Sequence, residues 1–210
     1  MIVAGSVSQD VEAPLESVIK GEVLRMYQEV AQNPQGEFHF YHGRPAAEML
    51  GYAPEWLECA PRAAVASFAG VGNPHVRSRL QPGEVVLDLG SGAGLDSIIA
   101  AWQVGGAGAG KVYGVDVNSD MRNKAAANTT AAGLANVQFL DGRMEDIPLP
   151  DHAVDVVISN GVINLSFRKR RVLSEVFRVL GPGGRISITD IVSAKPLSQS
   201  IVNDPKLWAS

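Results

Sequence analysis

Short apolar runs alternate with amphipathic stretches along the chain from about residue 84 onward. The runs are rich in valine, isoleucine and leucine, which is typical of strands buried on both faces of a sheet. We expect five strands, at residues 85–89, 112–116, 137–140, 154–159 and 185–192. Helical spacing predicts helices over residues 95–104, 119–132 and 167–180. Strands that alternate with helices indicate an α/β fold with a mostly parallel central sheet and helices on both faces.

The last of these helices carries its own end signals. Ser166 is a suitable N-cap residue, and the glycine-rich run at residues 181–184 is expected to stop the helix before the fifth strand. The apolar positions that this helix is expected to bury are Val172, Leu173, Val176, Phe177 and Leu180.

The N-terminal part of the chain has a different pattern. Residues 1–14 are small, polar and aperiodic, which predicts a loose tail. Apolar residues then recur at helical spacing over residues 15–31. Prolines between residues 37 and 83 leave room only for short helices, at 45–50 and 54–60.

The length and composition are those of one compact unit. We divide its 210 residues into an N-terminal tail and helical cap, 1–83, and a sheet domain, 84–210. The net charge of −4 argues against nucleic acid or an anionic membrane as the main partner, since both need a basic face. We find no apolar stretch long enough to span a bilayer and no signal peptide, and the one cysteine suits a reducing compartment. These features predict a cytoplasmic protein.

A glycine-rich loop follows the first expected strand. Its sequence, residues 88–94, is Asp-Leu-Gly-Ser-Gly-Ala-Gly, and Asp116 ends the next strand. In an open α/β sheet, ligands bind at the carboxyl ends of the strands, where glycines let the backbone approach closely. A bare strand–helix turn would explain the glycines alone, but Asp116 adds an acid that can bind two ribose hydroxyls.

Two classes of cofactor fit this layout, and Asp88 and Gly94 distinguish them. A dinucleotide site needs its third glycine one position later, where this chain has Leu95. The Asp88 carboxylate would repel a pyrophosphate but would suit an ammonium and a sulfonium group. These features favour S-adenosylmethionine over NAD. The acidic segment 141–150, after the third strand, is either a surface loop or part of the adenine site.

Together these segments resemble the class I methyltransferases, and more closely the arsenite methyltransferase family. The resemblance covers roughly residues 50–208. The matching stretches are 70–74 (GVGNP), 86–94 (VLDLGSGAG), 114–116 with Met121, 133–139 (GLANVQF), 156–165 (VVISNGVINL) and 175–190. It implies a Rossmann-like fold that binds adenosylmethionine and methylates a small molecule.

The resemblance also implies roles for particular residues. Those that would line the methionine and ribose sites are Asp88, Gly90, Ser91, Gly92, Asp116, Val117 and Met121. Met144 and Glu145 would lie near adenine, and Asn160 near the methyl group. Because methyl transfer from a sulfonium needs little beyond orientation and a dry pocket, we name no general base.

The chain departs from the family at the thiols that hold trivalent arsenic. Val71 and Gly161 stand where the family has cysteines, and a third cysteine usually follows the point where this chain ends. A cysteine-rich tract near the N-terminus is also missing. Cys59 matches none of these positions and is expected to be a buried or half-buried side chain.

Two other clusters have alternative interpretations. His39 and His42 could bind a metal or an anionic substrate, but an aromatic segment packed over the cofactor pocket is the favoured interpretation. The cationic run at 168–171 is expected to be a solvated helix face rather than a nucleic-acid patch. We predict no metal site.

Three functions therefore remain open: a small-molecule methyltransferase without the arsenic thiols, an arsenite methyltransferase that uses external thiols, and an inactive cofactor-binding fragment. Only 18 residues follow Val192, too few for the helix and two strands with which class I methyltransferases usually finish the sheet. We expect the sheet to be incomplete at this edge and the chain to be either a fragment or a partner-binder that self-associates through the edge.

Overall fold

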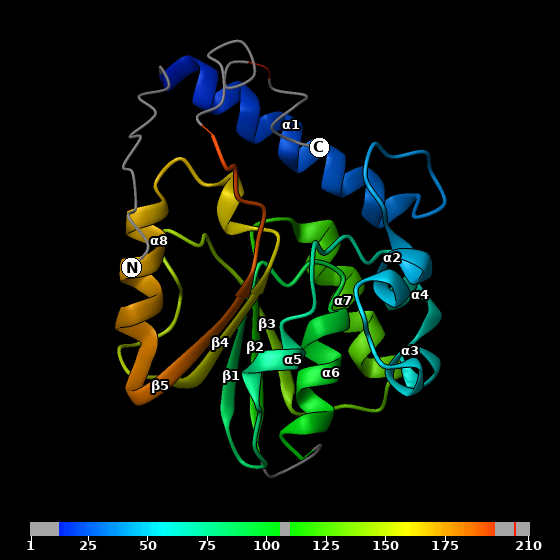
Figure 1. Cartoon of the computed structure of the whole chain (residues 1–210), viewed down its shortest axis with the longest axis vertical. Helices are drawn as coiled ribbons and strands as arrows, with labels where there is room; N and C mark the ends of the chain where they lie inside the picture. The colour runs from blue at the N-terminus through cyan, green and yellow to red at the C-terminus, as the bar shows by residue number, and fades with distance from the viewer. Residues whose placement is uncertain (1–12, 106–109, 196–203, 205–210) are drawn as a thin grey trace.

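The computed structural model describes residues 13–105, 110–195 and 204 (Figure 1). Its sheet has five parallel strands in the order β3-β2-β1-β4-β5. The strands are β1 (Val85–Leu89), β2 (Lys111–Asp116), β3 (Val137–Asp141), β4 (Val154–Asn160) and β5 (Leu180–Thr189). The expected Rossmann-like α/β fold is confirmed. Within the described ranges β5 pairs only with β4, so it forms an edge.

The strand order reverses between β1 and β4. Chain connections run outward from β1 through β2 to β3, and then return to β4 on the other side of β1. The loops after β1 and β4 therefore diverge at the carboxyl ends of two neighbouring strands. This switch point is where open α/β sheets form their ligand crevice.

Helices cover both faces of the sheet. On one face, α6 (Leu95–Gln103) packs Ala100, Ala101 and Val104 against Val86 and the neighbouring strands. Next to it lies α7 (Ser119–Ala131), which contacts β3 and ends before Gly133, whose φ of 68° provides the expected stop. On the other face, α8 (Lys169–Val179) packs against Leu87 and Leu89. Because successive side chains of β1 point to opposite faces, this one strand joins both cores.

The remaining helices form the N-terminal cap, apart from the short η1 (Ile163–Leu165) after β4. They are α1 (Ala13–Gln32), α2 (Gly43–Met49), α3 (Pro54–Cys59), α4 (Arg62–Ala66) and α5 (His75–Ser78). Figure 1 shows α1 lying across the carboxyl ends of the strands. Two side chains of the α7 segment hold it there: Asn118 Nδ2 donates to Leu24 O (3.2 Å) and Lys124 Nζ to Ala31 O (2.7 Å).

The interpretation of α8 was wrong in two respects. The helix begins at Lys169, and Ser166 lies before its N-cap Arg168, where its Oγ accepts from the Arg168 amide (3.0 Å). Val172, Val176 and Val179 form the buried stripe, whereas Leu173 is 48% exposed and Phe177 81% exposed. Leu173 and Phe177 each follow a buried position by one residue, which turns them about 100° away from the sheet.

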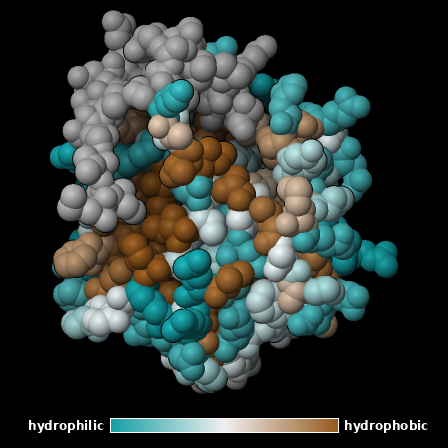
Figure 2. Space-filling model, in the orientation of Figure 1, coloured by the Kyte–Doolittle hydropathy of each residue, from teal (hydrophilic) through white to brown (hydrophobic). Residues whose placement is uncertain are grey.

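The expected bounds of the last strand also differ. Leu180 already pairs with Val154, and Arg185 pairs with Val156, so the glycine-rich run is a register irregularity inside β5 rather than a turn before it. The strand ends at Thr189, and Ile191 and Val192 beyond it are exposed. Figure 2 shows a hydrophobic surface along this side of the molecule.

The predicted N-terminal tail and the possibility of a membrane span remain to be compared with the structure. The predicted tail, residues 1–14, lies outside the described residues except for its last two positions, which belong to α1. Among the helices of the described ranges, none is both long and apolar enough to cross a membrane.

Candidate functional site

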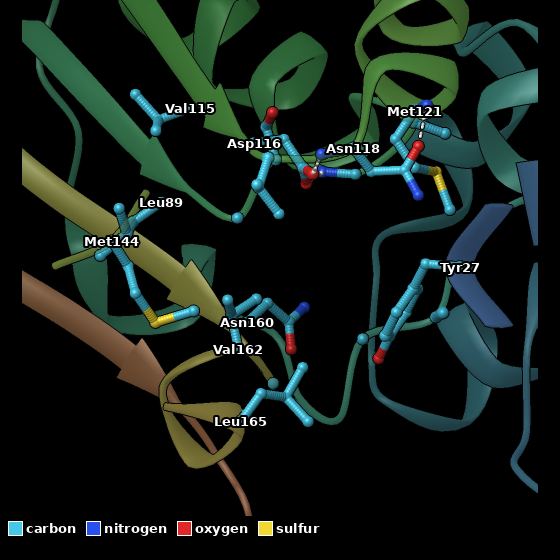
Figure 3. A pocket seen from close by; sticks show the side chains of 18 of the residues that line it. Tyr27, Leu89, Val115, Asp116, Asn118, Met121, Met144, Asn160, Val162 and Leu165 are labelled. Carbon is cyan, nitrogen blue, oxygen red and sulfur yellow. Dashed lines mark hydrogen bonds between the residues drawn. The ribbon is translucent and has the colours of Figure 1, made fainter. Parts of the chain in front are cut away.

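A pocket lies between α1 and the carboxyl ends of β1, β2 and β4 (Figure 3). One side, which we call the loop wall, is built from residues that follow β1, β2 and β3. Its members include Gly90, Ser91, Gly92, Asp116, Val117, Asn118, Met121, Met144 and Glu145. The other side, the cap wall, is built from α1, residues 64–70 and residues 160–165. It includes Ile19, Val23, Tyr27, Phe68, Gly70, Asn160, Gly161, Val162 and Leu165.

The glycine loop reaches the pocket because its backbone has a left-handed conformation. Gly90, Gly92 and Gly94 have φ values of 76°, 49° and 88°. A Cβ placed on Gly92 would have no atom within 4 Å, so this position faces open space at the pocket. A Cβ on Gly94 would instead lie 3.0 Å from Ala125 Cβ, which shows how closely α6 and α7 approach. The loop therefore offers bare backbone to a ligand.

Asp116 stands at the end of β2, beside this loop. Its Oδ2 accepts from the Gly92 amide (2.9 Å) and its Oδ1 from the Asn118 amide (2.8 Å). Each oxygen keeps a further lone pair, so both can accept another hydrogen bond from a ligand. Burial raises the pKa of the Asp116 carboxyl above its ordinary value, and the two backbone donors oppose that rise.

Asn118 supports Asp116 and was missed in the sequence. Its Oδ1 caps α7 by accepting from the Asp120 amide (2.9 Å) and the Met121 amide (3.2 Å). Its Nδ2 also binds α1, as described above. The signal that could have found it is an asparagine directly before a helix, which is a common N-cap.

Asp88 does not line this pocket. It is 2% exposed and its Oδ2 accepts from Ser97 Oγ (2.6 Å) at the start of α6. Burial, and next the charge of Asp96, raise the pKa of the Asp88 carboxyl to about 8. Asp88 thus lies between β1 and α6, away from the pocket lining, and its raised pKa does not favour the charged form that would attract the cofactor's ammonium.

The other residues expected near the cofactor lie on the loop wall, except Asn160, which lies on the cap wall. Val117 is 46% exposed and Met121 is buried. Met144 packs partly against the α8 core, and Figure 3 shows its side chain at the pocket. The Glu145 carboxylate is already bound, since it accepts from Ser166 Oγ (2.6 Å). The structure thus brings nine of the ten expected residues to the pocket, the exception being Asp88.

Tyr27 and Phe68 belong to the cap wall and were not expected there. Tyr27 points from α1 into the pocket, on the side opposite Asp116 (Figure 3). Burial, and then the charges of Asp116 and Asp190, raise the pKa of its phenol to about 12, so it is protonated at neutral pH. No local motif could have found these residues, because only tertiary packing brings α1 over the sheet.

The structure also locates the positions of the family's thiols. Val71 and Gly161 are neighbours, since a Cβ on Gly161 would lie 3.1 Å from Val71 Cγ1. Cys59 is exposed on α3 and does not line the pocket, which contradicts its expected burial. No thiol therefore lines the pocket in the described part of the chain.

The two other clusters have structural explanations. Phe38 stacks on Phe40 with ring centroids 5.5 Å apart, and His42 meets Phe38 edge-on at 4.9 Å. Phe38 and Phe40 pack with Tyr27 against Ala93 and Met121, so the segment is an aromatic cluster as expected, although none of its residues lines the pocket itself. No group of three or more metal-ligating side chains occurs among residues whose placement is described. The cationic residues 168–171 are exposed.

Adenosylmethionine fits the loop wall by the chemistry of its residues. An adenosine ribose presents two hydroxyls, and Asp116 offers two oxygens with free lone pairs at the pocket. The open space over Gly92 leaves room for the methionine part of the cofactor, and Met121 and Met144 supply apolar surface. No cationic side chain is needed, because the cofactor carries no phosphate.

Comparison with known proteins gives the same assignment. A match to the methyltransferase domain family covers residues 80–210. The chain is 45% identical over 136 residues to an arsenite methyltransferase of Halobacterium salinarum, covering 65% of this chain and 34% of the relative. It is 39% identical over 140 residues to an arsenite methyltransferase of Aquipseudomonas alcaligenes, covering 63% and 40%.

A solved structure agrees with these sequence matches. The crystal structure of an arsenic(III) S-adenosylmethionine methyltransferase from Chlamydomonas reinhardtii superposes with a TM-score of 0.60 at 36% identity. The superposition covers 78% of this chain and 54% of that one. The chain thus spans about a third to a half of the length of these relatives. It belongs to the methyltransferase domain family.

Proposed function

We propose that this chain is a methyltransferase of the arsenite-methyltransferase type that transfers the methyl group of S-adenosylmethionine to a small, apolar acceptor. The observation that carries the proposal is the two-sided pocket at the sheet's switch point. Its loop wall presents Asp116 and a bare glycine backbone, and its cap wall presents aliphatic and aromatic side chains. This is the layout expected of a cofactor site that faces an acceptor site.

The loop wall would hold the cofactor. Asp116 would accept hydrogen bonds from the ribose hydroxyls, Gly92 would let the methionine part approach the backbone, and Met144 would cover the adenine. The cofactor supplies a methyl group already activated on sulfur. The protein therefore has to orient the acceptor and exclude water, and orientation alone can contribute about 7–11 kcal/mol.

The cap wall would hold the acceptor. Val23, Phe68 and Leu165 make its surface largely apolar, and Tyr27 adds a phenol that stays protonated at neutral pH. Trivalent arsenic is a soft ion that prefers thiolate ligands. Since no thiol of the described residues lines the pocket, an uncharged apolar acceptor fits better than arsenite.

Turnover tests this proposal directly. The chain would be incubated with methyl-labelled adenosylmethionine and a panel of apolar small molecules, and with arsenite in the presence and absence of glutathione. Labelled product from an apolar acceptor, with arsenite at background, supports the proposal. Methylation of arsenite that requires glutathione would replace it with an arsenite methyltransferase using external thiols. Binding of cofactor without any transfer would indicate an inactive cofactor-binding protein.

We propose no nucleic-acid or anionic-membrane partner, since the net charge is −4, and a cytoplasmic location, since the single cysteine suits a reducing compartment. Self-association is the one macromolecular contact that we propose. Its support is the edge strand β5 with Ile186, Ile191 and Val192 exposed near it. Analytical ultracentrifugation tests this, and a concentration-independent monomer would contradict it.

A further inference from the structure

Asn160 ends β4 at the switch point, on the cap wall of the pocket. Its Oδ1 accepts from the Val71 amide (2.8 Å), the Gly72 amide (3.1 Å) and Thr189 Oγ1 (2.9 Å). Its Nδ2 donates to Tyr52 Oη (3.0 Å), Gly72 O (2.9 Å) and Asp96 Oδ2 (3.1 Å). One side chain therefore joins the cap, α6, β4 and β5.

The hydrogen-bonding capacity of this amide is used up. A side-chain amide has two N–H donors and an oxygen with two lone pairs. Three partners already surround Asn160 Nδ2, and three surround its Oδ1. No N–H donor or lone pair of this side chain remains for a hydrogen bond to a cofactor or an acceptor.

The segment 70–72 is shaped to receive this amide. A Cβ on Gly70 would lie 2.2 Å from Asn160 Nδ2, and a Cβ on Gly72 would lie 2.7 Å from Thr189 Cβ. Neither position can carry a side chain unless these contacts open. The two glycines let the 70–72 backbone approach closely enough for both of its amides to reach Asn160 Oδ1.

Asp96 fixes which end of the Asn160 amide faces which neighbour. Its carboxylate accepts from Tyr52 Oη (2.6 Å) and lies 3.0 Å from His75 Nε2. A carboxylate accepts hydrogen bonds only, so it selects the nitrogen end of the amide. The oxygen end is thereby turned toward the amides of Val71 and Gly72.

We propose that Asn160 is a positioning residue, which holds the 70–72 segment rigidly and with it Gly70 on the cap wall, rather than a ligand of the cofactor or the acceptor. This rests on the proposed function only in treating the cap wall as the acceptor side. The clamp would fix Gly70 at the pocket and would hold Val71 beside Gly161, which also lines the pocket.

Hydrogen exchange and ligand binding together test the clamp. Asn160→Ala removes all six of these polar contacts, while Thr189→Val removes only the contact with Asn160 Oδ1 among them and keeps the side-chain shape. We would measure amide exchange of a peptide spanning residues 70–73 in the ligand-free protein, and the affinity for S-adenosylhomocysteine by calorimetry. Asn118→Ala is the matched control, because it removes an asparagine that supports the loop wall instead.

The expected results separate the two roles. Asn160→Ala raises exchange in residues 70–73 by about tenfold or more, since two backbone bonds are lost, and Thr189→Val raises it less. Affinity for adenosylhomocysteine stays within about threefold in both variants but falls in Asn118→Ala. Unchanged exchange in Asn160→Ala would overturn the proposal, as would a loss of affinity above about tenfold in a variant that retains the native circular dichroism spectrum.

Two further outcomes are also decisive. If Asn160→Ala does not fold, Thr189→Val alone decides, and unaltered exchange at residues 70–73 in that variant overturns the clamp. If the wild-type chain does not bind adenosylhomocysteine, the proposed function fails, but exchange in the ligand-free variants still supports or overturns the clamp.

Discussion

The two walls of the pocket are held together by contacts of different range. On the loop wall, Asp116 binds the amide of Asn118, two positions further along the chain, and that of Gly92, 24 positions before it. On the cap wall, Asn160 binds Tyr52 and Gly72, which are 108 and 88 positions away. One wall is made by strand ends that lie side by side, and the other by side chains from distant segments.

This difference indicates which wall can change its side chains without losing its framework. The loop wall presents backbone amides and one carboxylate, whose positions the β1–β2 pairing imposes, so the proposed cofactor would be recognised mainly by backbone geometry. The cap wall presents side chains on a framework that the Asn160 clamp fixes separately. Side chains facing the acceptor can change while the framework stays, which is how one fold serves many substrates. Substitutions that change one wall at a time should therefore have separable effects on ligand binding.

The largest loss of affinity for adenosylhomocysteine is expected from Gly92→Val on the loop wall. Its φ of 49° disfavours a β-branched residue, and the added side chain would enter the open space of the pocket. We expect affinity for adenosylhomocysteine to fall at least about a hundredfold, measured by calorimetry.

Gly133→Val is the matched control for this change. Gly133 has a φ of 68° and also has no atom within 4 Å of an added Cβ, but it lies at the end of α7, away from the pocket. It should lose stability without losing ligand affinity. Equal affinity in the two variants would show that the glycine loop is only a turn.

The next effect is expected from Asp116→Ala. Loss of a charged acceptor costs about 1.5–3 kcal/mol, or roughly ten- to a hundredfold in affinity. Because burial raises the pKa of Asp116, wild-type affinity should start to fall, as the pH is lowered, at a higher pH than for an ordinary aspartate. The variant should show no such fall. Asp120→Ala, an acid at the start of α7 that does not line the pocket, is the control, and unchanged affinity in Asp116→Ala would refute the ribose assignment.

The loop wall could be predicted from the sequence because its signals are local. The apolar run 85–89 predicted β1, and the glycines and Asp116 follow strands whose carboxyl ends share one edge. The cap wall gave no such signal. Tyr27 belongs to a helix that was predicted well, but only tertiary contacts place α1 over the pocket.

The errors at α8 and β5 also concern tertiary contacts, which local sequence patterns do not encode. Apolar periodicity predicted the helix, yet Phe177 faces outward, because periodicity does not say how wide the buried stripe is. The helix does stop before the glycine-rich run, at Val179, but pairing of Leu180 with Val154 places the run inside β5. The sequence also could not show that Asp88 is buried away from the pocket lining, because a position at a strand end does not show which way the side chain points.

A smaller effect, on the affinity for arsenite, is expected from introducing two thiols beside the clamp with Val71→Cys and Gly161→Cys. A Cβ on Gly161 would lie 3.1 Å and 3.2 Å from the two γ-carbons of Val71, and cysteine at position 71 leaves a single γ atom in their place. The double variant should therefore fold better than Gly161→Cys alone, despite the strained φ of 72°. We expect arsenite affinity to rise by about tenfold, while adenosylhomocysteine affinity is unchanged.

Serine at both positions is the matched control for the thiols. It introduces the same backbone strain and similar side-chain size without a soft ligand. Calorimetric titration with arsenite compares the two variants, both made with Cys59→Ser so that the exposed thiol does not contribute. Equal arsenite binding by the serine and cysteine variants would show that these positions do not form a metalloid site.

The smallest effect on binding is expected from Asp88→Asn, which tests whether the acid under the loop wall takes part in recognition. Asp88 is 2% exposed and its pKa is raised to about 8, so at pH 7 it is mostly neutral and asparagine resembles it. Affinity for adenosylhomocysteine at pH 7 should therefore change by less than about threefold. A loss above about tenfold would show that Asp88 binds the ligand's ammonium.

The same variant should alter stability in a defined direction. Between the ordinary pKa of 3.8 and the folded value of about 8, the folded state binds the Asp88 proton while the unfolded state has released it. Its contribution to the free energy of unfolding therefore falls as the pH rises through this range, by at most about 1.4 kcal/mol per pH unit. Urea unfolding at pH 5, 6, 7 and 8 should show this decline in the wild type and a flatter profile in Asp88→Asn. Parallel profiles would mean that Asp88 is ionised in the folded protein, and a charge at that depth would require a cation that the described residues around it do not supply.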